Sequence, residues 1–412
     1  MYARWVAASL LTKLRRPFVH ILFGARQTGK STLLRSILPR DAVHYDLAEP
    51  GLRGRFLADP GAFAAECKAM PKRRGPTFVL IDEAQNVPSL FDAVQHLFDH
   101  DRRRWRFVLC GSSSRKLRAS GTNLLPGRSL LHRLYPLVVA ERPFAEQSSA
   151  NGSIVPMRWT TTASKELFPA VDLETRLAFG DLPGVAVAAE RDRAALLRSY
   201  ATAHLEEEIR REALVKDWAA FLRFLQLAAR ESGQITNHAA ISREAGVSQP
   251  TVKSHYQLLE DMFVGFTIPG WSKSPRKNLL STPRFLFFDV GVRHAAAGLP
   301  VGRATVQAAA GGIFEQWVGV ELWKRLQYRG RGTLHYLRSK DGAEVDYVVE
   351  DAGKVTPIEV KWTDKPTPGD CRHLRTFLDE HRTTAKQAFI VCRCPRPMQI
   401  EERITALPWW SL

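Results

Sequence analysis

A glycine-rich stretch near the N-terminus has the residue types that bind phosphate groups. In order, its residues are Gly24, Ala25, Arg26, Gln27, Thr28, Gly29, Lys30, Ser31 and Thr32. An apolar run precedes the stretch and a helical pattern follows it, so backbone N–H groups and the positive end of that helix would face phosphate oxygens. Lys30 would bridge the β- and γ-phosphates, and the Ser31 hydroxyl would ligate Mg²⁺. The pattern therefore predicts a site for ATP with Mg²⁺.

Two acidic residues, Asp82 and Glu83, end a later apolar run. At the C-terminal end of a strand beside the glycine-rich loop, Asp82 would hold the Mg²⁺ through its water shell. Glu83 would polarise the attacking water as a general base. An acid pair, unlike a single Asp, favours hydrolysis over nucleotide binding alone.

A third apolar run, residues 106–110, is followed by Gly111 and three serines. The ends of parallel strands converge on the ligand crevice, so Ser112 or Ser113 would contact the γ-phosphate or the attacking water. A capped turn before a helix that begins near Arg115 is the alternative.

Four residues near the C-terminus have a pattern suited to a second metal site: Glu315, Asp346, Glu359 and Lys361. Glu315 lies on a helical stretch and the other three on expected strands. Because strand side chains alternate between faces, Glu359 and Lys361 share one face, which Asp346 can join from the neighbouring strand. Two carboxylates can hold Mg²⁺ or Mn²⁺, and the ammonium can orient a water for attack on a phosphodiester. The pattern resembles the restriction-endonuclease-like fold, although DNA contact without cleavage and a purely structural Glu–Lys pair stay open.

Residues 235–266 have the pattern of a winged-helix or helix-turn-helix module. Ala245, Gly246 and Val247 form a turn between two short helices, and Ser248 would cap the second helix. Such a helix commonly enters a DNA major groove, but the same modules also contact proteins. The positions that we expect to be exposed for DNA are Gln249, Thr251, Lys253 and His255. Beyond the module, Arg338 and Lys340 would suit a phosphate backbone.

These sites imply an α/β chain of several parts. Short apolar runs at 18–23, 43–46, 77–81, 106–110 and 130–139 alternate with helical stretches, which predicts a parallel P-loop sheet. A helical connector or lid follows, then the helix-turn-helix, then a restriction-endonuclease-like α/β domain. The predicted boundaries are 1–146, 165–230, 231–283 and 284–412.

The motifs together resemble the AAA-type ATPase superfamily, and in particular a prokaryotic group with a C-terminal domain of unknown function 4143. The glycine-rich loop, the 81–85 and 111–114 motifs and residues 126–128 carry the resemblance, and segments at 180–183, 200–211, 288–291 and 344–346 also fit. Membership implies an ATPase core. It also implies assembly into a homo-oligomer in which an arginine of one subunit reaches the neighbour's γ-phosphate. Arg128 is the first candidate for that arginine, with Arg115 and Arg118 as alternatives.

Composition limits the partners and the location. The 59 Lys and Arg residues exceed the 42 Asp and Glu residues, so the net charge of +17 favours polyanions and makes DNA a plausible partner. The five cysteines lack the spacing of a zinc site and suggest reduced thiols. No apolar run approaches the roughly 20 residues that span a bilayer, so we expect a cytoplasmic protein without a membrane segment.

Two main functional hypotheses follow. In the first, ATP hydrolysis drives the binding or remodelling of DNA, with a nuclease-like C-terminal domain. In the second, nucleotide state switches a signalling or defence protein whose C-terminal half binds other proteins and has no nuclease activity. A third, a protein remodeller, lacks a recognisable peptide-gripping loop. Salt-dependent DNA binding would separate the first hypothesis from the others.

Overall fold

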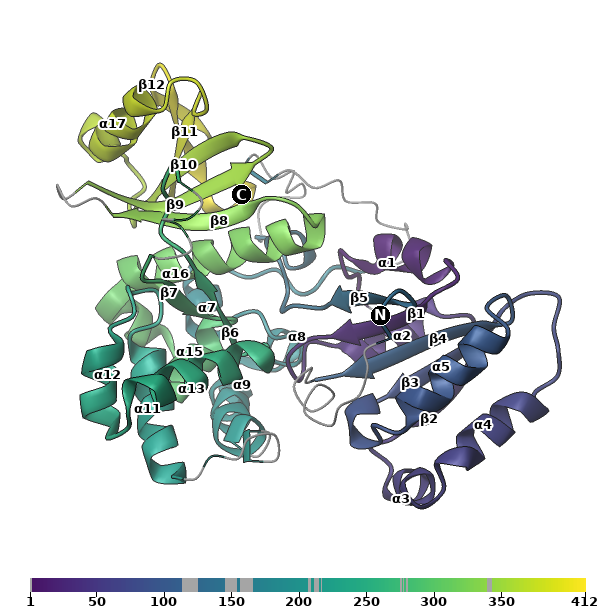
Figure 1. Cartoon of the computed structure of the whole chain (residues 1–412). Helices are drawn as coiled ribbons and strands as arrows, with labels where there is room; N and C mark the ends of the chain where they lie inside the picture. The colour runs from purple at the N-terminus through teal and green to yellow at the C-terminus, as the bar shows by residue number, and fades with distance from the viewer. Residues whose placement is uncertain are drawn as a thin grey trace. The chain divides into compact units, whose positions relative to one another are not determined.

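The computed structural model divides the chain into two compact units, which are described separately (Figure 1). The N-terminal unit consists of Ala3–Tyr135 with Asp261–Phe263, and the C-terminal unit contains Pro136–Glu260 and Val264–Leu412. The structure describes residues 2–112, 125–144, 154–155, 166–206, 209–210, 215, 217–274, 276, 278, 281–338 and 343–412.

The N-terminal unit contains a parallel sheet of five strands within the described residues, in the order β2-β3-β4-β1-β5. The strands are β1 (Val19–Phe23), β2 (Val43–Asp46), β3 (Thr77–Asp82), β4 (Trp105–Gly111) and β5 (Ser129–Arg133). The predicted parallel α/β sheet is thus confirmed.

The last strand is shorter than predicted. We expected a strand over 130–139, but β5 ends at Arg133. The next residue, Leu134, donates its N–H to the carbonyl of Phe23, and Leu137 donates to the carbonyl of Asp181. The segment after Arg133 is apolar and buried, but its backbone bonds are made outside a strand ladder, which periodicity cannot reveal.

Helices cover both faces of the N-terminal sheet, because neighbouring residues of its strands alternate between two cores. Ile21 and Leu109 belong to the core formed with α3, α4 and α5. Leu22 and Cys110 belong to the core formed with α1 and α2. The helices are α1 (Ala7–Leu14), α2 (Lys30–Ile37), α3 (Pro50–Ala58), α4 (Pro60–Ala69) and α5 (Leu90–His100).

In the first half of the C-terminal unit, the described residues are mostly helical and include a two-stranded antiparallel ribbon. Its α-helices are α7 (Leu173–Phe179), α8 (Pro183–Val187), α9 (Glu190–Ser199), α11 (Trp218–Arg230), α12 (His238–Ala245), α13 (Gln249–Asp261) and α15 (Val290–Ala296). A π-helical turn, Tyr200–Leu205, follows α9. The ribbon pairs β6 (Gly265–Ile268) with β7 (Arg284–Phe287).

The second half of this unit contains a mixed sheet of six strands among the described residues, in the order β12-β13-β11-β10-β9-β8. Its strands are β8 (Thr333–Arg338), β9 (Glu344–Asp351), β10 (Lys354–Val360), β11 (Ala388–Cys392), β12 (Met398–Glu401) and β13 (Ile404–Pro408). The long helix α16 (Arg303–Arg329) contacts β8 and β10, and α17 (Arg372–Glu380) shares a buried core with the sheet. Glu315 therefore lies on a helix, as predicted, and Asp346 and Glu359 lie on strands β9 and β10.

Two further properties concern the described residues as a whole. None of their helices is both long enough and apolar enough to cross a membrane. All five cysteines are buried and free, in agreement with the absence of a paired cysteine pattern.

Candidate functional site

The glycine-rich loop connects β1 to α2, as its sequence predicts. Gln27 and Gly29 have positive φ angles of 59° and 87°, which turn the backbone sharply before the helix begins at Lys30. Gly24 cannot carry a side chain, because a Cβ there would lie 2.2 Å from the carbonyl oxygen of Leu134. The first turn of α2 contains no acidic residue and no side chain caps it. Its N–H groups and partial positive charge therefore suit an anion.

Lys30 is held by neutral groups. Its Nζ donates to the carbonyl oxygens of Gly24 and Ala25, both at 2.9 Å, and the residue is only 6% exposed. Thr28 Oγ1 also donates to the Ala25 carbonyl. From the segment before α1, the buried Arg4 donates to the carbonyls of Thr28 and Tyr135, at 2.6 and 2.7 Å. The loop is therefore shaped by buried donors from two places in the chain.

The acids and the serine form a second group of polar side chains at the C-terminal ends of β3 and β4. Asp82 is buried at the end of β3, and its Oδ1 accepts the N–H of Glu83 at 3.1 Å. Gln85 links the other two predicted residues, because its Nε2 donates to Glu83 Oε2 and, at 3.3 Å, to Ser112 Oγ. Ser112 is fully buried.

Asp82 is the last residue of β3, and β4 lies between β3 and β1 in the sheet. The strand that ends at Gly111, just before Ser112, is therefore the neighbour of both. Cys110 of this middle strand interacts electrostatically with Lys30 and Asp82, and burial raises the pKa of its thiol well above the ordinary value. A neutral thiol thus lies near both Lys30 at the start of α2 and Asp82 at the end of β3.

The remaining predicted residues of this site lie in different surroundings. Ser31 is half-buried and Thr32 is exposed at the start of α2. Arg128 precedes β5, at the end of the sheet opposite the glycine-rich loop, and its Nε donates to both carboxylate oxygens of Asp99 at 2.7 Å. Ser113, Arg115 and Arg118 lie outside the described residues.

In the C-terminal unit, the four residues of the predicted second site do come together. Glu359 Oε1 accepts from Lys361 Nζ at 2.7 Å, and Asp346 Oδ2 accepts the N–H of Val360 at 2.8 Å. Burial and the nearby Asp346 raise the pKa of Glu315 and of Glu359 to about 7. We call Glu315, Glu344, Asp346 and Glu359 the carboxylate cluster.

A buried arginine that the sequence analysis did not consider enters this cluster. Arg284 of β7 donates from Nη1 to Glu315 Oε1 at 2.8 Å and from Nη2 to Glu344 Oε1 at 2.7 Å. Its side chain is 5% exposed and lies over the ring of Tyr336. Among the described residues, no group of three His, Cys, Asp or Glu side chains is arranged to hold a metal ion.

Three family models match separate parts of the chain. An AAA domain matches residues 16–142, a domain of unknown function (DUF8612) matches 170–302, and a domain of unknown function (DUF4143) matches 310–412. The chain is an AAA-type protein with a C-terminal DUF4143 domain. The resemblance inferred from the motifs is thus confirmed.

Similar curated proteins have no assigned function. The AAA-type protein is 27% identical over 376 residues to an uncharacterized protein of Mycobacterium tuberculosis, covering 91% of this chain and 77% of the relative. It is 22% identical over 359 residues to an uncharacterized protein of Haemophilus influenzae, covering 83% and 82%.

Two solved structures show only weak similarity to the AAA-type protein. C. elegans PCH-2 aligns with a TM-score of 0.25 and 14% identity over 62% of this chain and 67% of that one. Protein VC1899 from Vibrio cholerae aligns with a TM-score of 0.19 and 11% identity over 95% of both chains. The fold assignment therefore depends on the family model and on the parallel sheet.

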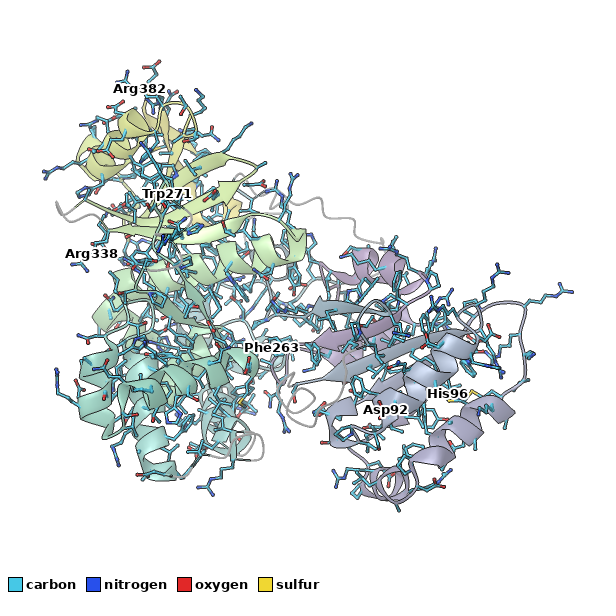
Figure 2. The ribbon with its side chains drawn as sticks, viewed as in Figure 1. Asp92, His96, Phe263, Trp271, Arg338 and Arg382 are labelled. Atoms are coloured by element: carbon cyan, nitrogen blue, oxygen red, sulfur yellow. The ribbon has the colours of Figure 1, made fainter. Side chains whose placement is uncertain are left out.

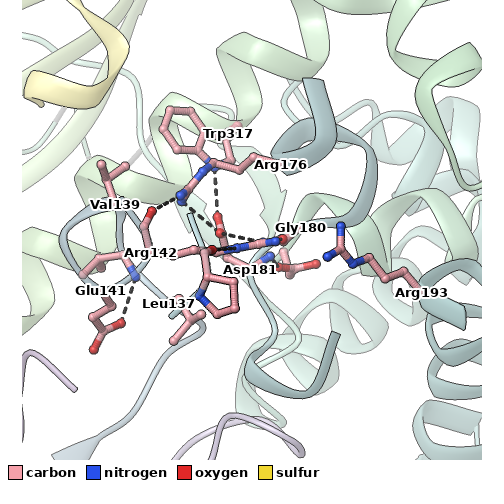
Figure 3. A network of polar contacts seen from close by, with 12 residues as sticks. Leu137, Val139, Glu141, Arg142, Arg176, Gly180, Asp181, Arg193 and Trp317 are labelled. Atoms are coloured by element: carbon pink, nitrogen blue, oxygen red, sulfur yellow. Dashed lines mark hydrogen bonds and ion pairs between the residues drawn. The ribbon is translucent and has the colours of Figure 1, made fainter. Parts of the chain in front are cut away.

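Two segments that fit the resemblance, 180–183 and 288–291, make buried polar contacts in the C-terminal unit, and Figure 3 shows those of Gly180 and Asp181. Asp181 accepts from Arg176 at 2.9 Å and from the indole N–H of Trp317 at 3.1 Å. Arg142 donates to the carbonyl of Gly180 at 3.0 Å. Asp289 accepts the N–H of Asp181, and burial raises the pKa of Asp289 to about 6. These buried contacts give both motifs a structural role.

Two helices, α12 and α13, lie in the segment for which a helix-turn-helix was predicted. Gly246 is left-handed after α12, and Ser248 Oγ accepts the N–H of Thr251. Gln249 and Lys253 are exposed, whereas Thr251 is half-buried. The expectation that His255 is exposed is wrong, because its ring packs against Phe221 and Phe224 at centroid distances of 4.9 and 5.0 Å.

Sequence reasoning missed Gln85, Arg4 and Arg284. Gln85 stands two residues after Glu83 in the acid motif, so its position was a usable signal. Arg284 is the single charge in the apolar run of β7, and a buried charge needs a counter-charge. No signal pointed to Arg4, which bonds to Tyr135 across 131 positions of the chain.

Proposed function

We propose that this AAA-type protein is a Mg²⁺-dependent ATPase whose hydrolysis of ATP is coupled to the binding or remodelling of DNA. The observation that carries the proposal is the hydrogen-bonded group of Glu83, Gln85 and Ser112 at the strand ends, together with the Lys30 loop at the end of β1. A site that only binds nucleotide does not need a second acid with a dedicated amide partner.

The residues present fit the metal that an ATPase requires. Ser31 offers a hydroxyl at the start of α2, and Asp82 offers a carboxylate oxygen at the end of β3. Arg35, the cation beside Asp82, is half-exposed and 3.8 Å away, so it does not block this carboxylate. Ser31 and Asp82 would hold Mg²⁺, which supplies charge neutralisation on the β- and γ-phosphates when bound.

Each side chain then has a distinct role. Lys30 would exchange its carbonyl partners for phosphate oxygens, which costs little because both sets are hydrogen-bond acceptors. The residues from Gly24 to Thr32 would bind the phosphates through backbone N–H groups. Glu83 would accept a proton from the attacking water, with its carboxylate oriented by Gln85. Ser112 would sense the γ-phosphate through the same amide.

Arg128 would complete the neighbouring site in a homo-oligomer. Its pair with Asp99 lies at the surface, where water screens the attraction between the two charges. Release of Arg128 toward a partner's phosphate would therefore be inexpensive, and a positioned arginine stabilises the charge that develops during phosphoryl transfer.

Three features support a DNA role. The net charge is +17, the successive helices α12 and α13 leave Gln249 and Lys253 exposed, and Arg338 is exposed at the end of β8 (Figure 2). We propose a winged-helix fold for residues 231–283 and a restriction-endonuclease-like fold for 284–412. Lys340 lies outside the described residues. The free cysteines fit a reducing compartment such as the cytoplasm.

The test is the ATPase rate with single-stranded, duplex and branched DNA, each at low and high salt. We expect at least one DNA to raise the rate at low salt, and we expect that effect to fall steeply with salt because phosphate contacts release counterions. Lys253→Ala should weaken the effect, whereas Lys68→Ala on α4 serves as an exposed control. An unchanged rate, together with no DNA shift on a gel, would favour the nucleotide-switched signalling or defence protein.

A further inference from the structure

We propose that Arg284 is the built-in cation of the carboxylate cluster and takes the place of a divalent metal ion, so that the C-terminal domain is not a metal-dependent nuclease. The inference goes beyond the proposed ATPase and does not depend on it. It concerns the metal that a restriction-endonuclease-like fold implies, for which the described residues do not provide a suitable set of ligands.

The position of Arg284 supports this assignment. Its two terminal nitrogens bridge Glu315 on α16 and Glu344 on β9, with distances of 2.8 and 2.7 Å. Asp346 is close enough to contribute, together with Glu315 and Glu344, to the raised pKa of Arg284, against the lowering effect of burial. A guanidinium that bridges two carboxylates at hydrogen-bond distance neutralises them much as a metal ion would.

The other two carboxylates are also satisfied within the chain. Asp346 accepts the backbone N–H of Val360, and Glu359 accepts from Lys361. The second oxygen of Glu359 is buried without a hydrogen-bond partner. Two side-chain cations, Arg284 and Lys361, therefore neutralise part of the charge of the cluster.

The backbone around Arg284 explains why the arginine stays in the cluster. Arg284 pairs with Ile268 in the β6–β7 ribbon and forms a further bridge with Ile235. Its side chain thus begins on a fixed strand and has little freedom to withdraw. A metal ion that approached the cluster would have to displace a buried guanidinium that donates hydrogen bonds to two carboxylates.

Removal of the arginine charge should open the cluster to metal. The experiment is calorimetric titration of the full chain, without nucleotide, with Mn²⁺. We expect the affinity of the carboxylate cluster for Mn²⁺ to be at least 10-fold higher in Arg284→Gln than in the parent. We expect this gain in affinity to be lost in Arg284→Gln combined with Glu359→Gln. Arg303→Gln removes a half-exposed arginine of the same unit and should show no gain. Any Mn²⁺ at Asp82 is common to all variants and cancels in the comparison.

Two results would overturn the proposal. One is Mn²⁺ binding by the parent that Glu359→Gln abolishes. The other is an Arg284→Gln variant, folded by circular dichroism, that binds Mn²⁺ no more tightly than the parent. Should Arg284→Gln fail to fold, the parent and Asp346→Asn decide the matter: equal Mn²⁺ heats support the proposal and a loss in the variant refutes it. Because no arm measures ATP turnover, failure here is distinct from failure of the proposed ATPase.

Discussion

The two acidic sites of this protein differ in what neutralises them. In the nucleotide site, Lys30 is held by backbone carbonyls and Glu83 by the neutral amide of Gln85. In the carboxylate cluster, Arg284 bridges Glu315 and Glu344, and Lys361 pairs with Glu359. In the first site, Lys30 and Glu83 are held by neutral groups that a ligand can replace, whereas in the second site Arg284 and Lys361 pair directly with carboxylates.

The difference shows that residue types alone do not define a metal site. Both regions have acids at strand ends and a lysine close by, and both match a known pattern. Neutral partners can be exchanged for phosphate at low cost, but a buried ion pair is expensive to break, because one charge is left without its partner. Variants in the nucleotide site and in the carboxylate cluster can each test this difference.

The largest effect should come from Lys30→Ala, which removes the charge of the nucleotide site. We expect ATP turnover to fall by about 100-fold or more, because charge on the transferred phosphoryl group loses its main side-chain partner. Steady-state phosphate release would measure the effect, with Lys68→Ala as the exposed lysine control. If Lys30→Ala keeps near-parental turnover, Lys30 does not act on the phosphates, and the proposed difference between the two sites is contradicted.

Glu83→Gln should separate hydrolysis from binding. We expect turnover to fall by roughly 10²–10⁴-fold, the range for loss of a general base, while the affinity for ATP stays near that of the parent. Fluorescent-nucleotide binding and phosphate release, measured on the same preparation, would test both halves. Equal losses of binding and turnover would show that Glu83 is not a base.

Gln85→Leu should sharpen the role of the neutral amide. We expect kcat to fall about 10-fold with little change in KM, equivalent to about 1.4 kcal/mol of transition-state stabilisation. Gln95→Leu on the nearby helix α5 is a matched control with no expected effect. If KM rises instead and kcat holds, Gln85 only supports the fold of the site.

The carboxylate cluster should make the stability of the folded protein depend on pH. The pKa of Glu359 is about 7 in the folded protein against an ordinary value of 4.5, so the folded state retains a proton that the unfolded state loses between these values. The stability from this group is complete below pH 4.5 and is lost as pH rises through 7. Relative to Glu359→Gln, the unfolding temperature of the parent should fall by at least ~2 °C from pH 5 to pH 8. A constant difference would contradict the raised pKa.

Sequence located those segments of the candidate nucleotide site whose residues are neighbours in the chain. The glycine-rich loop and the acid pair each occupy one short segment, and their strands alternate clearly with helices. The insertion of β4 between β3 and β1 could not be predicted, because strand order depends on packing between distant segments. The end of β5 was misjudged, because a buried coil and a strand are equally apolar.

The cluster shows the other limit of sequence reasoning. Glu315, Asp346, Glu359 and Lys361 were recognised, yet their chemistry depends on Arg284, which lies 31 residues from Glu315 and 60 from Glu344 along the chain. No periodicity links residues so far apart. Likewise, His255 has a polar ring on an amphipathic helix, and only the packing of α11 shows that this ring is half-buried.

Calorimetric titration with Mg·ATP is the most direct test of the central claim, which is that the Lys30 loop binds a triphosphate. We expect the folded parent to release or absorb heat with one-site saturation, and we expect Lys30→Ala to lose it. A folded parent that gives no heat at several temperatures, or a Lys30→Ala variant that titrates like the parent, would contradict the account.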